Sequence, residues 1–278
     1  MAEQTKVTLR DGNVIPQIGL GVWQVDPAIT ERVVTDGIKA GYRSIDTAEG
    51  YGNEEGVGAA IRNAGVARSE LFITSKLRNG GHARDLALKS FDDTMKKLGI
   101  ADIDMFLIHW PVPSQDKYVE AWKTMVELQK QGRIKSIGVS NFNPDHIERI
   151  VGETGVTPVV NQIELHPTFQ QTKNRPFYKQ HSIAVESWSP LGSGADLKNP
   201  AIGEIANKHG KSIAQVIIRW HLQEGFIVIP KSIHANRMQE NIDVFDFELD
   251  AGDMTRIRGL DDPKGRVGAD PATAAFLF

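Results

Sequence analysis

Short apolar runs rich in β-branched residues alternate along the chain with longer amphipathic stretches. The short runs predict strands, and they occupy residues 18–21 (the weakest of them), 43–46, 71–76, 103–109, 136–140, 159–163, 184–187 and 226–230. Between the runs, apolar residues recur every three or four positions, as at Leu88, Phe91, Met95 and Leu98, which predicts helices. Strands that alternate with helices are typical of βαβ units and a parallel sheet. The pattern therefore predicts an α/β protein, and its repetition favours a closed (β/α)₈ TIM barrel.

The regions at the two ends of the chain depart from this alternation. Residues 6–15 contain Asp11-Gly12 between two β-prone arms, which predicts an N-terminal β-hairpin. We expect one barrel domain over residues 1–278, with the hairpin in 1–16 and C-terminal helices and a tail in 231–278. Length alone leaves one large barrel or two smaller domains open.

An open doubly wound sheet is the alternative architecture. If it bound a dinucleotide, it would normally carry G-x-G-x-x-G after its first strand. Gly19-Leu20-Gly21 continues to Gln24, and Gly50-Tyr51-Gly52 continues to Glu55, so neither segment completes this fingerprint. The sequence therefore favours the barrel.

Composition narrows the class of protein. Hydrophobic residues make up 40% and charged residues 24% of the 278 positions, as in an ordinary globular enzyme. The net charge of −3 predicts no nucleic-acid partner. The chain has no cysteine, which excludes disulfides, thiolate nucleophiles and Cys-based metal sites, and we expect no bound metal. Residues 1–6 lack the apolar core of a secretory signal, and the apolar runs are too short to span a bilayer. We expect a cytoplasmic monomer with no membrane partner.

Polar residues follow several predicted strands. In a barrel, the C-terminal ends of the strands meet at one mouth, where polar side chains usually serve function. Asp46, Lys76 and His109 occupy such positions, and Tyr51 lies nearby in sequence. An adjacent ammonium favours a phenolate over a phenol, so Lys76 would lower the pKa of Tyr51. Asp46 would hold the lysine, and His109 would orient a carbonyl oxygen. The four residues predict a proton-transfer site.

Taken singly, each of these residues has an ordinary explanation as a turn cap, a packing ring or a solvated charge. Most of the eight histidines are expected on the surface. His82, His146, His181 and His209 stand in polar contexts, and we do not expect them to be catalytic. The shared position at one barrel mouth distinguishes Asp46 and His109 from them.

Three separate stretches resemble the signatures of the aldo-keto reductases. The first is GYRSIDTA at 41–48, followed by Glu54 and Val57-Gly58; the second is KSIGVSNF at 135–142. The third is IPKS at 229–232, followed by Arg237 and Glu240-Asn241. They occur in the right order and are spread over nearly the whole chain. The sequence therefore resembles this family throughout.

The resemblance implies a (β/α)₈ barrel that binds NADPH in extended form and reduces an aldehyde or ketone to the alcohol. It implies a catalytic tetrad of Asp46, Tyr51, Lys76 and His109, the set already found at the strand ends. It also implies coenzyme contacts: Ser140, Asn141 and Gln162 at the nicotinamide carboxamide, Trp188 stacked on its ring, Lys231, Ser232 and Arg237 at the adenosine 2′-phosphate, and Glu240 and Asn241 near the adenine.

The substrate expectation comes from finer likeness. Segments 161–167, 186–188 and 244–247 resemble the short bacterial 2,5-diketo-D-gluconate reductases. Arg78 stands where the family commonly has Trp, and the C-terminal segment is shorter than the aromatic loop of larger members. We therefore expect a small, polar, anionic carbonyl compound such as 2,5-diketo-D-gluconate, contacted by Arg78, with Trp23 and Trp110 as aromatic walls.

Two other functions remain open at this stage. A Schiff-base lyase on the same barrel would use Lys76 or Lys231 as the amine nucleophile. A regulatory subunit that senses NADPH would bind the nucleotide with little turnover. The position of Lys76 beside Asp46 and Tyr51 argues against the lyase, and the complete tetrad argues against a pure binding protein.

Overall fold

The computed structural model describes residues 4–278. Residues 1–3, which belong to the expected hairpin segment 1–16 and to the N-terminal stretch 1–6, lie outside the described residues. Within the described range, one parallel sheet of eight strands runs in the order β10-β9-β8-β7-β6-β5-β4-β3. Its strands are β3 (Leu20–Gly21), β4 (Ser44–Asp46), β5 (Phe72–Leu77), β6 (Ile103–Ile108), β7 (Ile134–Ser140), β8 (Val160–Glu164), β9 (Ala184–Trp188) and β10 (Ile227–Val228).

Backbone contacts join the two edges of this sheet. Ile18 forms a parallel bridge with Val228. The N–H of Gly19 donates to the carbonyl of Val228 at 2.9 Å, and the N–H of Val228 donates to the carbonyl of Gln17 at 2.9 Å. Every neighbouring pair in the sheet is parallel. The expected (β/α)₈ barrel is confirmed, although the predicted run 226–230 forms a strand only at Ile227–Val228.

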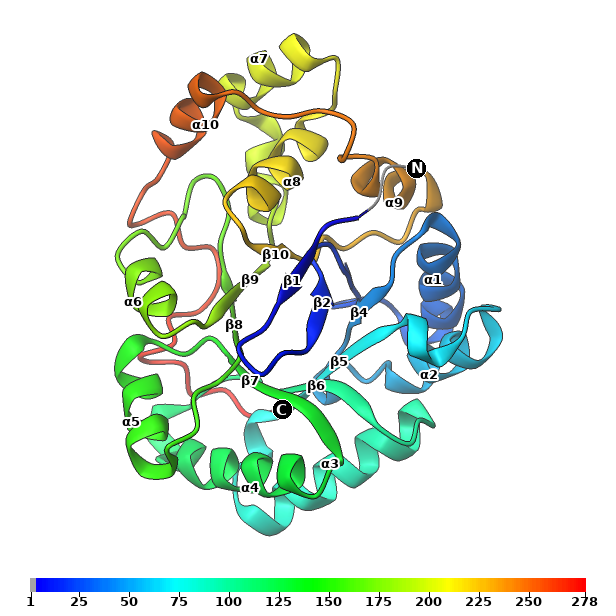
Figure 1. Ribbon diagram of the computed structural model, residues 1–278, viewed down its shortest axis with the longest axis vertical. Helices are drawn as coiled ribbons and strands as arrows, with labels where there is room; N and C mark the ends of the chain where they lie inside the picture. Colours follow the sequence, from blue (N-terminus) through cyan, green and yellow to red (C-terminus); the bar gives the residue numbers. More distant parts are fainter. Residues whose placement is uncertain (1–3) are drawn as a thin grey trace.

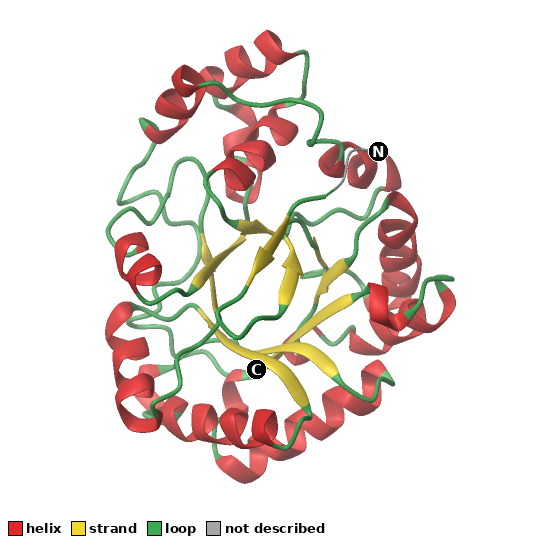
Figure 2. Cartoon of the chain, in the orientation of Figure 1, coloured by secondary structure: helices red, strands yellow, loops and turns green. Residues whose placement is uncertain are grey.

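Helices surround the strands on the outside (Figures 1 and 2). They are α1 (Pro27–Ala40), α2 (Glu54–Asn63), α3 (Arg84–Leu98), α4 (Tyr118–Lys130), α5 (Pro144–Thr154), α6 (Arg175–Gln180), α7 (Pro200–His209), α8 (Ile213–Gln223), α9 (Ala235–Ile242) and α10 (Ala251–Arg258). Local chemistry fixes their ends. At α8, the Ser212 hydroxyl accepts from the N–H of Gln215 at 3.2 Å, and the Gln215 side chain accepts from the N–H of Ser212 at 3.0 Å. At α1, Gly41 ends the helix with φ 112°, a left-handed backbone that favours glycine.

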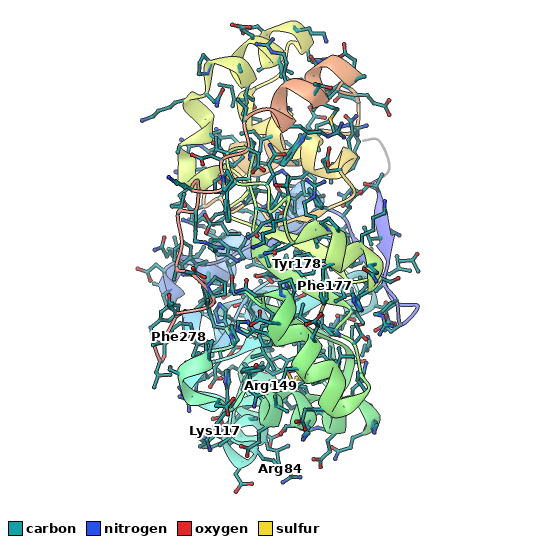
Figure 3. All side chains as sticks on the ribbon, turned by 90° about the vertical axis from the view of Figure 1, so that its left-hand side faces the viewer. Arg84, Lys117, Arg149, Phe177, Tyr178 and Phe278 are labelled. Atoms are coloured by element: carbon teal, nitrogen blue, oxygen red, sulfur yellow. The ribbon has the colours of Figure 1, made fainter. Side chains whose placement is uncertain are left out.

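The N-terminal hairpin closes one end of the barrel. Strands β1 (Lys6–Thr8) and β2 (Val14–Pro16) pair antiparallel, as the Asp11-Gly12 turn predicts. Leu9 and Ile15 are buried against residues from the interior of the barrel, including Met105 and Leu107. In Figure 3 this blue hairpin lies on the right and Phe278 on the left, at opposite ends of the barrel. The C-terminal strand ends therefore open on the side away from the hairpin.

The helices were compared with what a membrane span requires. Between residues 4 and 278, no helix combines the length and the apolar character required to cross a bilayer. Cytoplasmic location, a monomeric state and the single-domain assignment stay predictions.

Candidate active site

The four residues of the expected tetrad lie together at the mouth. Asp46 ends β4, Lys76 lies near the end of β5, His109 directly follows β6, and Tyr51 ends the short 3₁₀ helix Glu49–Tyr51. The Lys76 Nζ donates to Asp46 Oδ1 at 2.5 Å and to the Tyr51 hydroxyl oxygen at 3.3 Å. The rings of Tyr51 and His109 meet edge to face, with their centroids 5.5 Å apart.

Lys76 is held as a charged donor. Its third hydrogen bond goes to the carbonyl of Thr47 at 3.0 Å, so all three ammonium hydrogens have acceptors. Burial alone lowers the pKa of Lys76, but the Asp46 carboxylate together with the nearby Tyr51 and Glu186 outweighs burial, and the net pKa is raised. A Schiff-base nucleophile needs a neutral amine, so this environment argues against the lyase alternative at Lys76.

Tyr51 keeps its proton in this setting. Burial raises the pKa of its phenol, and the Lys76 ammonium lowers it by less than burial raises it. The lowering of the Tyr51 pKa by Lys76 that the sequence predicts is present, but burial has the larger effect and the net pKa is raised. Because the phenol oxygen accepts from Lys76, its own O–H remains available to donate. Lys76 would stabilise the phenolate left after that proton departs.

His109 is a neutral imidazole. Burial and then the Lys76 ammonium hold its pKa well below the ordinary value. Its Nδ1 is buried without a hydrogen-bond partner among residues 4–278. A neutral imidazole carries one N–H, which suits it to donate a hydrogen bond to a carbonyl oxygen rather than to supply the transferred proton.

A buried carboxyl group behind the tetrad was not assigned to the site from sequence. Gln162 Nε2 donates to Asp46 Oδ2 at 2.8 Å and to Glu186 Oε2 at 2.9 Å. Burial, followed by the nearby Asp46 charge, raises the pKa of Glu186 to about 8. The sequence signal was a glutamate inside an otherwise buried strand, β9, at residues 184–188. Gln162 thus connects the tetrad to a second carboxyl group.

The residues expected around the nicotinamide are also brought together. Trp188 Nε1 donates to Asn141 Oδ1 at 2.8 Å, and Asn141 Nδ2 donates to the carbonyl of His109 at 3.0 Å. Ser140 Oγ donates to the carbonyl of Gln162 at 2.9 Å. Asn141 has φ 62°, a strained backbone of the kind that clusters at functional sites. These bonds fix the half-buried Trp188 ring at the wall of the mouth.

A cavity of about 460 Å³ joins these groups, within the usual range for small-molecule sites. Tyr51, His109 and Trp188 line it, together with the expected aromatic walls Trp23 and Trp110. Trp23 is 52% exposed, whereas Trp110 is buried. Asp46, Tyr51 and His109 of the tetrad and the residues expected around the nicotinamide therefore face one cavity.

Two further aromatic walls come from the tail and were missed. Phe276 packs against Trp110 with centroids 5.1 Å apart, and Phe278 packs against His109 at 5.2 Å. A Cβ on Gly50 would lie 2.4 Å from the Phe278 ring, so glycine permits this close packing. The C-terminal segment was expected to be short and to lack the long aromatic loop of larger family members; Phe276 and Phe278 were the available signal for an aromatic wall.

Arg78 is placed differently from the other expected substrate residues. It is absent from the cavity lining, and its Nε lies 3.3 Å from Glu49 Oε1. Its guanidinium approaches Gly80, beside the Phe278 backbone. Arg78 therefore lies behind the aromatic wall with its charge paired, and its contact with substrate stays a prediction.

The residues expected at the 2′-phosphate and adenine lie around the start of α9. Lys231 is exposed and lines the end of the cavity, and Arg237 is exposed on α9. Ser232 and Asn241 are buried, and Glu240 is half-buried. Within residues 4–278, neither Lys231 nor Arg237 forms an ion pair, so both cations are free to bind an anion.

The expectation that most histidines are surface residues is wrong. Relative exposure is 0% for His82, 5% for His146 and 0% for His221. His146 Nδ1 accepts from the N–H of Asn143 at 3.2 Å, and His221 contacts the carbonyls of Ile217 and Leu165. The rings of His146 and His221 are buried where they cap or bridge backbone groups, whereas both ring nitrogens of His82 lack a hydrogen-bond partner among residues 4–278. A polar sequence context reveals neither arrangement.

Comparisons with known proteins agree with this arrangement. The model of the "Aldo/keto reductase family" matches residues 17–262. Methylglyoxal reductase DkgA of Escherichia coli (strain K12) is 52% identical over 273 residues, which cover 98% of each chain. An aldo-keto reductase of Mycolicibacterium smegmatis is 51% identical over 271 residues, again 98% of each chain.

A solved structure extends the agreement to the whole backbone. The crystal structure of a Gox0644 mutant in complex with NADPH has a TM-score of 0.96 and 52% identity to this chain. The match covers 99% of this chain and 100% of that one. Sequence, fold and the arrangement at the mouth therefore lead to one assignment: this chain belongs to the aldo/keto reductase family of oxidoreductases.

Proposed function

We propose that this protein reduces a small aldehyde or ketone to the alcohol with NADPH. One observation carries the proposal: the Tyr51 phenol, 3.3 Å from the Lys76 ammonium, lines the same cavity as neutral His109 and Trp188. This arrangement supplies a proton donor, a charge that stabilises its conjugate base, a second hydrogen-bond donor and a flat aromatic wall. These are the parts that carbonyl reduction requires.

NADPH is the coenzyme of this family, and the residues present fit it. Its nicotinamide would lie against Trp188, with Ser140, Asn141 and Gln162 at its carboxamide. Its 2′-phosphate would lie at the opposite end, where exposed Lys231 and Arg237 have no competing partner in the described chain. Bound there, NADPH supplies the hydride for the carbonyl carbon.

The protein's own residues then handle the carbonyl oxygen. His109 donates a hydrogen bond that positions the oxygen and stabilises its developing negative charge. Tyr51 gives its proton to that oxygen, and Lys76 stabilises the resulting phenolate. Asp46 keeps Lys76 charged and oriented through the 2.5 Å contact. In the oxidative direction, the Tyr51 phenolate would act as the base on an alcohol.

The substrate class follows from the cavity walls. Four aromatic side chains, Trp23, Trp110, Phe276 and Phe278, enclose the cavity beside the tetrad, which favours a small carbonyl compound. A keto-sugar acid such as 2,5-diketo-D-gluconate is the finer proposal. Arg78 would be the cation that attracts its carboxylate. Relatives named methylglyoxal reductases make a neutral 2-oxoaldehyde the second candidate.

Initial rates with a panel of carbonyl compounds test the proposal. The panel contains 2,5-diketo-D-gluconate, methylglyoxal, aldoses and aromatic aldehydes, each with NADPH and with NADH. We expect coenzyme oxidation with NADPH well above that with NADH, and the highest kcat/KM for a small substrate. Tight NADPH binding without consumption on any compound would instead support a regulatory, nucleotide-sensing protein.

A further inference from the structure

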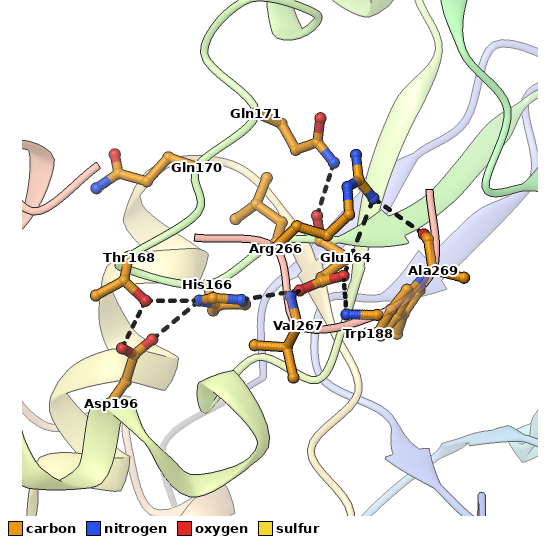
Figure 4. Close-up of polar contacts among 12 residues, drawn as sticks. Glu164, His166, Thr168, Gln170, Gln171, Trp188, Asp196, Arg266, Val267 and Ala269 are labelled. Carbon is orange, nitrogen blue, oxygen red and sulfur yellow. Dashed lines mark hydrogen bonds and ion pairs between the residues drawn. The ribbon is translucent and has the colours of Figure 1, made fainter. Parts of the chain in front are cut away.

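A second buried ionic cluster lies beside the active site, and the proposed reaction gives it no role. It consists of Glu164 at the end of β8, His166 two residues later, and Asp196 in the connection between β9 and α7; we name these three residues the latch (Figure 4). Relative exposure is 1% for Glu164, 1% for His166 and 2% for Asp196. Ionic groups buried this deeply need a compensating arrangement.

The latch requires a charged histidine. His166 Nδ1 lies 3.1 Å from Asp196 Oδ2, and His166 Nε2 lies 3.2 Å from Glu164 Oε1. An ionised carboxylate only accepts hydrogen bonds, so both ring nitrogens must donate, and only the imidazolium has two N–H groups. Burial lowers the pKa of His166, but the bonds to Asp196 and Glu164 outweigh it and raise the pKa to about 8.

The latch also holds the C-terminal segment against Trp188. Glu164 accepts from the backbone N–H of Val267 at 2.5 Å and of Gly268 at 2.9 Å. A Cβ on Gly268 would lie 2.5 Å from the Trp188 ring, so this backbone packs directly on the indole. Val267 and Gly268 both line the cavity. Glu164 thus fixes the backbone that packs on the Trp188 ring.

The other end of the latch holds the β9–α7 connection. Thr168 Oγ1 donates to Asp196 Oδ1 at 2.8 Å, which ties this connection to the segment after β8. Pro190 and Ser193, from the same connection as Asp196, line the cavity. His166 therefore couples two cavity-lining segments, residues 189–196 and 265–269, that are distant in sequence.

We propose that His166 is a positioning residue for the coenzyme: its imidazolium holds both segments against Trp188 and so sets the affinity for NADPH. The inference rests on the proposed function. It assigns the latch to coenzyme retention, because both segments it joins line the cavity beside Trp188, and Gly268 packs on the ring on which the nicotinamide would stack. None of the three latch residues itself lines the cavity or forms a hydrogen bond to the tetrad.

The other charged groups around His166 are consistent with a single titration. Arg266, on the C-terminal segment, lies 4.0 Å from Glu164 Oε2. His221, on α8, has its pKa lowered to about 4 by burial and is neutral. Because the folded pKa of His166 is raised, the latch is complete below its ordinary value of 6.5 and is lost as pH rises through about 8.

Titration of NADPH by quenching of tryptophan fluorescence, from pH 7 to 9.5, tests the proposal. The wild-type Kd should rise at least about fivefold as pH passes 8, a typical coupling between sites. His166→Gln keeps a polar side chain of similar size but cannot carry the positive charge. The Kd of this variant for NADPH should be raised at pH 7 and should not change with pH. His181→Gln, a histidine at the end of α6 outside the cavity, is the matched control and should follow the wild type.

Several outcomes would overturn the inference. A pH step retained in His166→Gln would assign the titration to another group, with Glu186 the first candidate. A flat wild-type Kd would overturn the latch while leaving carbonyl reduction intact, whereas no NADPH binding at pH 7 would overturn both. If His166→Gln does not fold, Asp196→Asn serves instead. It removes one charge that raises the histidine pKa, so the midpoint of the Kd step should move to lower pH, and an unchanged midpoint would contradict the latch.

Discussion

The two ends of the proposed coenzyme groove are built in opposite ways. At the tetrad, Asp46, Lys76 and His109 are buried, and the lysine already has all its hydrogen bonds. At the start of α9, Lys231 and Arg237 are exposed and, within residues 4–278, unpaired. The first end is fixed before any ligand arrives, and the second has charges that only a ligand would engage.

This difference separates chemistry from recognition. A transition state is stabilised most by groups that need no reorganisation, which a buried cluster held by internal hydrogen bonds provides. An exposed cation binds an anion at little desolvation cost, but its attraction is screened by salt. We therefore expect changes at the buried end to alter kcat and changes at the exposed end to alter coenzyme affinity. Each prediction below can break that division.

The largest effect is expected at the buried end. Tyr51→Phe removes the proton donor and leaves the ring, so kcat should fall by about 10²- to 10⁴-fold, the usual contribution of general acid catalysis. The Kd for NADPH, measured by fluorescence quenching, should stay near the wild-type value because the phenol faces the substrate. Near-wild-type reduction by this variant would remove Tyr51 from the mechanism. A parallel loss of NADPH affinity would break the division between the two ends.

The meeting of Asp46, Lys76 and His109 at one mouth could be predicted from sequence because the barrel rule needs only strand ends. Asp46, Lys76 and His109 each close an apolar run, and a parallel sheet brings such ends to one mouth. Glu186 also lies in a predicted strand, but its raised pKa comes from burial and from the Asp46 charge, which no local pattern links to it. Long-range contacts of this kind require coordinates.

The position of the aromatic residues in the C-terminal tail also could not be predicted from local sequence patterns. Phe276 and Phe278 follow no strand and repeat with no helical period, so periodicity gives no reason to place them at His109. Their position depends on tertiary packing against Trp110 and Gly50. The latch could not be predicted either, because no local pattern links Glu164 and His166 in segment 161–167 to Asp196 about 30 residues later. Sequence therefore predicted the strand-end residues and the walls Trp23 and Trp110, whereas the walls Phe276 and Phe278 depend on tertiary contacts.

The second prediction concerns the exposed end. Arg237→Ala should raise the Kd for NADPH about ten- to a hundredfold, since a hydrogen bond to a charged group contributes about 1.5–3 kcal/mol. The Kd for NADH should barely change because NADH lacks the 2′-phosphate. Added salt should weaken NADPH binding more than NADH binding. Fluorescence titration with both coenzymes measures this.

The matched control for the second prediction is Arg256→Ala. Arg256 is also an exposed arginine, but it lies on α10 and pairs with Glu204 at 2.7 Å. Its loss should leave both dissociation constants unchanged. Equal losses for NADPH and NADH in Arg237→Ala would mean that Arg237 supports the local fold and that the phosphate binds elsewhere.

The third prediction tests the charge state of the buried end. Burial and Asp46 raise the pKa of Glu186 to about 8 from an ordinary 4.5, so the unfolded chain loses this proton at lower pH than the folded one. This group therefore lowers the free energy of unfolding as pH rises from about 4.5 to 8. Glu186→Gln is neutral throughout and should gain in Tm over the wild type by at least about 2 °C at pH 8. The gain should be small at pH 5. Thermal unfolding at both values measures it, and a gain independent of pH would show that Glu186 is ionised in the folded protein.

The smallest effect is expected at Arg78, an exposed cation beside the buried end. Its side chain is 38% exposed and already pairs with Glu49 at 3.3 Å, so its attraction for a substrate carboxylate is screened and partly neutralised. Arg78→Met removes the charge and keeps much of the length, whereas Arg78→Trp restores the usual aromatic residue. Both should lower kcat/KM for 2,5-diketo-D-gluconate by no more than about fivefold, the scale of an exposed ion pair, and leave methylglyoxal unchanged. Initial rates with the two substrates measure the ratio of the two kcat/KM values.

If only Arg78→Trp lowers the rates, and does so equally for both substrates, the tryptophan crowds the Phe278 wall and Arg78 does not select acids. A drop of a hundredfold confined to the keto acid would show that Arg78 leaves Glu49 and enters the cavity, so an exposed charge would belong to the catalytic end after all.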